Sequence, residues 1–127
     1  MNLRIRNVAA IALIFSVIVA TPGTARAAPN DAVIKNQSFS YTYLTVCKDL
    51  ISDTQCGRTV GFLYPGQDSL SKYGWRDTDA IYCGQGWWCQ IDSNTFRGSG
   101  TGWNSRLIKV PGCFGCTMYV YLYPDHG

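Results

Sequence analysis

The chain has no glutamate and a single histidine, His126, which stands next to the last residue. A chain terminus tends to fray, and this histidine has no evident carboxylate partner to orient it as a general base. The Gly98–Gly102 segment lacks both the strand-to-helix setting of a nucleophile turn and the lysine of a phosphate-binding loop, so it is predicted to be an ordinary loop. This scarcity of catalytic groups predicts a protein that is not an enzyme and that uses no cofactor.

Acidic and metal-binding patterns are equally sparse. Asp77 and Asp79 have the spacing of two carboxylates on one face of a strand, which a glycosidase or a calcium site would use. However, Asp-Thr-Asp before an apolar strand is typical of a turn closed by side-chain hydrogen bonds, and no calcium-loop pattern follows it. Zinc is not expected, because Cys83 and Cys89 are spaced too widely for a ligand pair and His126 is terminal.

Clusters of positive charge are also missing. Of the 11 lysines and arginines, Arg4, Arg6 and Arg26 lie in the amino-terminal segment, and the rest match the 8 acidic residues in number. The net charge of +3 therefore belongs to that segment, and the remainder is formally neutral. Nucleic-acid binders carry a basic patch and membrane-active helices a basic face, so neither class is expected here.

No apolar run is long enough to span a bilayer. The run from Val8 to Ala20 is preceded by two arginines and followed by small residues at Ala25 and Ala27. A charged start, a short apolar stretch and a small-x-small site are the three parts of a secretory signal peptide. We predict a signal peptide over residues 1–27 and one secreted, extracellular domain over residues 28–127, without stable membrane insertion.

Cysteine is abundant by contrast. An even number of cysteines in a short exported chain is typical of a disulfide framework. The cysteines fall into three local couples, each flanking a turn rich in glycine or polar residues, and a Cys-x-x-Cys redox site would need a βαβ context that is absent. The predicted pairs are Cys47 with Cys56, Cys83 with Cys89, and Cys113 with Cys116.

Short β-type runs alternate with turn signals along the whole mature segment, and no stretch has a convincing helical period. We predict an all-β fold, a small disulfide-cross-linked barrel or sandwich of about six short strands. The strands are expected near residues 39–46, 58–64, 79–83, 87–91, 104–110 and 117–123.

Aromatic residues exceed what a core of this size is expected to bury, which suggests a recognition surface. Trp87 and Trp88 must point to opposite faces if their segment is extended. In the last predicted strand Tyr119, Tyr121 and Tyr123 alternate with aliphatic residues, so the aliphatic face is expected to be core and the tyrosine face to be exposed.

These features predict a binding protein that engages an extracellular polymer or protein through Trp87, Trp88 and the three tyrosines. The alternative is an inhibitor of a secreted protease, in which Phe114 between Cys113 and Cys116 serves as the bait residue on a rigid loop. A small secreted toxin is a further alternative. Export, compactness and cross-linking are common to all three.

Overall fold

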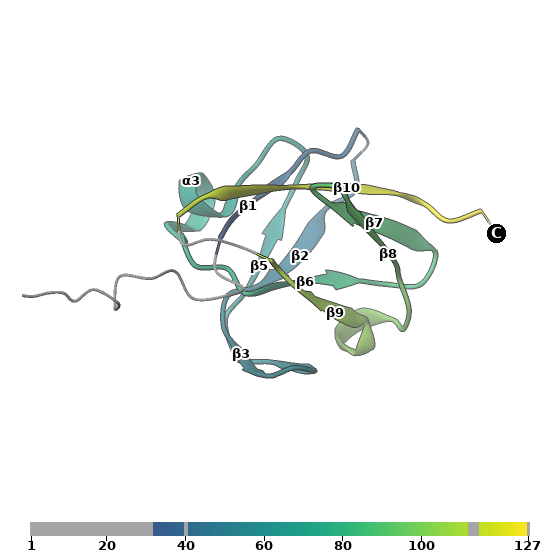
Figure 1. The fold of residues 1–127 in the computed structure, drawn as a ribbon, viewed down its shortest axis with the longest axis horizontal. Coiled ribbons are helices and arrows are strands. Elements are labelled where there is room, and N and C mark those ends of the chain that lie inside the picture. The colour runs from purple at the N-terminus through teal and green to yellow at the C-terminus, as the bar shows by residue number, and fades with distance from the viewer. Residues whose placement is uncertain (1–31, 40, 112–114, 127) are drawn as a thin grey trace, which may run out of the picture.

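The computed structural model describes residues 32–39, 41–111 and 115–126 (Figure 1). The predicted signal peptide, Cys113 and the candidate bait residue Phe114 lie outside the described residues. In chain order the elements are β1 (Val33–Asn36), β2 (Leu44–Cys47), β3 (Leu50–Ser52), β4 (Gln55–Cys56), β5 (Val60–Leu63), the helix α3 (Ser69–Tyr73), β6 (Ala80–Cys83), β7 (Trp87–Ile91), β8 (Asn94–Arg97), the 3₁₀ helix η2 (Gly102–Asn104), β9 (Arg106–Lys109) and β10 (Thr117–Pro124).

The strands form two four-stranded sheets and one hairpin. One sheet has the order β1-β10-β7-β8, with β1 parallel to β10, and the other has the order β5-β2-β6-β9. Figure 1 shows β10, in yellow, crossing one side of the molecule while the hairpin of β3 and β4 projects on the other side. The prediction of an all-β, disulfide-linked fold is confirmed, and the described strands form no closed barrel.

Both four-stranded sheets bury side chains in one common core, which is how a small domain satisfies two apolar sheet faces at once. In β10, Val120 and Leu122 point into this core while Tyr121 between them points outward. In β2 and β6 the core positions are taken by aliphatic residues and by Cys83. The core comprises Ala32, Ile34, Leu44, Val46, Leu63, Ile81, Cys83, Cys89, Ile91, Ile108, Val110, Val120 and Leu122.

The six predicted strands correspond to β2, β5, β6, β7, β9 and β10. The expected count was too low, because β1, β3, β4 and β8 are strands as well. Of these, β3, β4 and β8 lie in segments rich in turn residues and are short or mostly exposed. They therefore lack the apolar alternation that marks a strand.

The helix α3 was also not expected. It is only five residues long, which is too short to display a helical period. Its ends nevertheless carry ordinary helix signals: the Asp68 carboxylate accepts from the Ser71 amide at 2.7 Å, and Gly74 ends the helix in a left-handed conformation (φ 78°).

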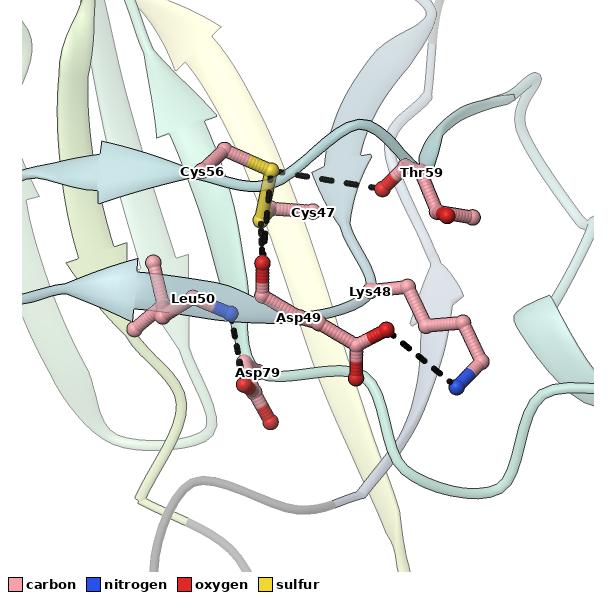
Figure 2. Close-up of a disulfide and its surroundings, with 7 residues drawn as sticks. All are labelled: Cys47, Lys48, Asp49, Leu50, Cys56, Thr59 and Asp79. Carbon is pink, nitrogen blue, oxygen red and sulfur yellow. Dashed lines mark hydrogen bonds and ion pairs between the residues drawn. A yellow bond between two sulfur atoms is a disulfide. The ribbon is translucent and has the colours of Figure 1, made fainter.

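The disulfide between Cys47 and Cys56 ties the β3–β4 hairpin to the sheet, as Figure 2 shows. The carbonyl oxygen of Asp49 lies 3.4 Å from Cys47 Sγ, directly below the bridge. On the other side of the hairpin, the Leu50 amide donates to the Asp79 carboxylate at 2.8 Å. The hairpin is therefore fixed at its base.

The disulfide between Cys83 and Cys89 joins β6 to β7 and so connects the two sheets. Both residues are fully buried in the core. Two of the three predicted pairs are thus confirmed, and no described cysteine is a free thiol. The predicted partner of Cys116, Cys113, lies outside the described residues.

Candidate binding site

Strand β7 places the two adjacent tryptophans on opposite faces, as predicted from their alternation. Trp87 packs against the common core and is half-buried. Trp88 points outward, where it pairs across the sheet with Tyr123 of β10 and with Arg97 of β8. The two tryptophans therefore belong to different surfaces.

The alternation predicted for the last strand is confirmed in β10. Val120 and Leu122 are buried, whereas Tyr119 and Tyr123 are 41% and 39% exposed and Tyr121 is half-buried. The three tyrosines lie on the outward face of the sheet, and together with Phe39, Gln90 and Asp92 they line a hollow of about 500 Å³. We call this surface the tyrosine hollow.

Polar contacts hold the side chains around the tyrosine hollow. The Tyr123 hydroxyl lies 3.5 Å from Gln90 Oε1, and the guanidinium of Arg97 lies 5.6 Å from the centre of the Trp88 ring. Arg97 also forms a two-pronged ion pair with Asp125, which raises the pKa of the guanidinium through hydrogen bonding and charge. Among the rings that line the hollow, Tyr123 is held by this contact with Gln90, so it loses less rotamer freedom when a partner binds.

A second, larger surface lies on the outward side of the other sheet and was not predicted from the sequence. Six aromatic side chains surround a groove of about 580 Å³, which we call the aromatic groove. They come from β5 and β6, which lie on either side of β2 in this sheet, from β7 of the first sheet, from the segment before β2 and from η2. These residues are Tyr41, Tyr43, Phe62, Tyr82, Trp87 and Trp103.

The rings of the aromatic groove contact one another edge to face. Tyr82 and Trp103 have ring centres 5.7 Å apart, and Tyr43 and Phe62 have ring centres 5.6 Å apart. Trp103 is 67% exposed and Tyr41 is 96% exposed, so both present flat apolar surface to solvent. Burial raises the pKa of the Tyr82 phenol above its ordinary value.

The polar groups that line the aromatic groove are uncharged. Thr42, Thr45 and Ser105 add hydroxyl groups to those of the tyrosines. Among the described residues that line the groove, none is an aspartate, lysine or arginine. The combination offers flat rings and neutral hydrogen-bonding groups, which suits a neutral, hydroxyl-rich ligand better than a charged one.

Trp103 is held in place by the loop that the sequence identified only as an ordinary loop. The Gln85 amide donates to the Gly100 carbonyl at 2.8 Å, and the Ser99 amide donates to the Cys83 carbonyl at 3.1 Å. A Cβ on Gly98 would lie 1.8 Å from the Gly84 carbonyl oxygen, so only glycine permits this close approach. The loop is fastened to the inter-sheet disulfide segment and presents Trp103 from a fixed base.

Most residues of the aromatic groove were missed because strand alternation alone does not say which strands are neighbours. Phe62 stands between buried Gly61 and Leu63, and Tyr82 stands between buried Ile81 and Cys83. This alternation marks both rings as outward-facing. Their meeting depends on the pairing of β2 with both β5 and β6, which the sequence did not predict.

Asp77 and Asp79 each bind a residue 29 positions away, whereas the sequence predicted hydrogen bonds that close a local turn. Asp79 accepts from the Leu50 amide, and Asp77 pairs with Lys48 at 3.3 Å. Burial alone would lower the pKa of Lys48, but the hydrogen bond to Asp77 and the charges of Asp77 and Asp49 together raise it. These carboxylates are engaged in fixing the base of the hairpin.

No protein-family model, no curated protein and no solved structure matches this chain. Within residues 32–39, 41–111 and 115–126, no helix has the length and apolar character needed to cross a membrane.

Proposed function

We propose that the protein is exported and binds a neutral extracellular polysaccharide in the aromatic groove. Sugar rings have one flat apolar face and a rim of hydroxyl groups, so they stack on aromatic rings and exchange hydrogen bonds at the edge. The observation that carries the proposal is the lining of the groove, which combines six aromatic rings with uncharged hydroxyl groups. Export is supported by the disulfides and by the charged and apolar amino-terminal segment.

The exposure of the rings supports the same proposal. Tyr41 and Trp103 contribute little to the core, and exposed apolar rings lower the solubility of a protein. A partner that covers the two rings offsets this cost. Fixed rings also bind with a smaller entropic cost than mobile ones, and Trp103 is fixed by the loop that rests on Gly84. A polyanion is disfavoured because the described residues that line the groove include no cationic group to neutralise it.

The test is retention of the secreted protein on neutral and anionic polymers. Cellulose, chitin and starch serve as neutral probes, and heparin and alginate beads serve as anionic probes. We expect retention on at least one neutral polymer that persists in about 1 M NaCl, because uncharged contacts are not screened. Trp103→Ala should weaken it about tenfold, as loss of a contact tryptophan does.

Ile51→Ala is the matched control. Ile51 is also well exposed (65%), but it lies on β3 and does not line the aromatic groove. This variant removes exposed apolar surface without touching the proposed site, so it should bind like the parent protein. Retention on anionic beads alone, or on none of the neutral polymers, would contradict the proposal. Inhibition of secreted proteases is measured alongside, since a bait loop would give inhibition without polysaccharide retention.

A further inference from the structure

The aromatic groove and the tyrosine hollow lie on either side of one residue of β10. Leu122 lines both of them, although the groove opens on one sheet and the hollow on the other. The two surfaces are therefore neighbours around an edge of the molecule.

The edge of β10 between the two surfaces is covered by residues 37–39, which are not a strand; the Gln37 amide donates to the Val120 carbonyl at 2.8 Å. β1 pairs with β10 only as far as the Asn36–Val120 pair, whereas β10 continues to Pro124. Beyond that point the Leu122 amide is bonded to the Ser38 hydroxyl at 2.8 Å instead of to a strand. A polymer that runs from one surface to the other would therefore cross over the segment that carries Phe39, and not over an open strand edge.

Two aromatic rings stand at this edge, one beside each surface. Phe39 lines the tyrosine hollow and is 97% exposed, and Tyr41 lines the aromatic groove and is almost fully exposed. Neither ring belongs to the core cluster. The two residues are two positions apart in the chain, so one short segment offers an exposed ring to each surface.

The chemistry of the tyrosine hollow fits the ligand proposed for the groove. Its described lining combines four aromatic rings with the amide of Gln90 and the carboxylate of Asp92, which also accepts from the Tyr119 amide at 3.3 Å. Amides and single carboxylates are suitable partners for sugar hydroxyl groups. The neighbouring charge of Arg97 is compensated by Asp125, so the surface does not select a polyanion.

We propose that the aromatic groove and the tyrosine hollow form one continuous path, on which a single neutral polysaccharide chain bends around the edge marked by Phe39 and Tyr41. This inference rests on the proposed function and specifies its ligand further, as a polymer long enough to contact both sheets. Short oligosaccharides fill the groove alone. Longer ones gain the contacts of the hollow.

The experiment measures the affinity of the secreted protein for a ladder of oligosaccharides cut from whichever neutral polymer retains it. In the parent protein the affinity should rise with length in two stages, first for the groove and then for the hollow. Phe39→Ala and Tyr123→Ala should remove the second stage only, each weakening the longest oligosaccharides about tenfold. Tyr41→Ala should weaken all lengths. Phe39→Ala and Tyr41→Ala are a matched pair, because both rings are almost fully exposed and neither substitution is expected to unfold the protein.

Several outcomes would overturn the path. If Phe39→Ala and Tyr123→Ala bind every length like the parent while Tyr41→Ala does not, the groove stands as the site and the path is wrong. Turbidity with long polymer that Phe39→Ala abolishes would show two independent sites that cross-link chains. A dimer in sedimentation that Phe39→Ala dissociates would show that the tyrosine hollow receives a second copy. Absence of binding at every length would refute the proposed function itself.

Discussion

The adjacent tryptophans of β7 allow one stability prediction to be worked out in detail. Trp87→Ala removes a ring that packs on the core and lies beside the inter-sheet disulfide. A tryptophan buries up to about 250 Å² when covered, and a half-buried one buries roughly 150 Å². At about 25 cal/mol per Å² the loss is close to 4 kcal/mol, an upper value because unfolded chains are already partly collapsed. We expect about 3 to 4 kcal/mol.

Trp88→Ala acts on the opposite face and should cost less because Trp88, although also half-buried, does not pack against the core cluster. The ring loses a cross-strand contact with Tyr123, worth about 0.2 to 1 kcal/mol, and a cation–π contact with Arg97, worth about 0.5 to 1 kcal/mol. We therefore expect a loss of about 1 to 2 kcal/mol. The difference between the two variants should be near 2 kcal/mol, although the same ring is removed from neighbouring positions.

The assay is urea unfolding of both variants under non-reducing conditions, followed by far-ultraviolet circular dichroism. Binding to the retained polysaccharide is measured on the same samples. Trp87→Ala should weaken binding because Trp87 lines the aromatic groove, whereas Trp88 lines neither surface. Equal losses of stability, or a larger loss for Trp88→Ala, would refute the assignment of the two rings to core and outer face.

Three further predictions concern the framework. Gly98→Ala should lower the free energy of unfolding by at least about 3 kcal/mol in urea melts, because its Cβ would collide with the backbone of Gly84; a neutral effect would contradict the close approach. Replacing Cys83 and Cys89 together by alanine should cost about 3 to 4 kcal/mol, from loop entropy and two lost buried sulfurs, and a loss below about 1 kcal/mol would refute their role in joining the sheets. Burial raises the pKa of Tyr82, so the phenol loses its proton at a lower pH in the unfolded chain than in the folded protein. The free energy of unfolding should therefore fall as the pH rises above about 10, and it should fall less for Tyr82→Phe. Identical pH profiles of stability for the two proteins would contradict the burial of the phenol.

The strands of the core could be predicted because each carries a strong local signal. The alternation of Val120 and Leu122 with tyrosines marks β10 by itself, and the cysteines at the ends of β6 and in β7 mark a cross-link. The short strands could not be predicted in this way. β3 and β4 are short and mostly exposed, and their base is held partly by the Asp79 carboxylate, which is 29 residues away from Leu50 in sequence.

The candidate site was predicted only in part, for a related reason. Tyr119, Tyr121 and Tyr123 share one strand, so their common face follows from the period of two. Tyr82 and Trp103 are brought together by β6 and by the loop that rests on Gly84, and the sequence has no local pattern for that contact. A surface assembled from several elements depends on strand order, which alternation alone does not determine.

The free edge of β5 bears on why exposed rings persist in this protein. The Phe62 amide donates to the Tyr73 hydroxyl at 2.9 Å, and the Lys72 ammonium donates to the Phe62 carbonyl at 2.6 Å, so side chains of α3 occupy backbone groups that an edge strand would offer to another chain. The chain thus blocks one route to association while Phe39 and Tyr41 stay almost fully exposed. Folding gains almost no free energy from a ring left in water, and such a ring adds to the risk of aggregation. A ligand that covers these two rings accounts for their exposure, which the packing of the core does not explain.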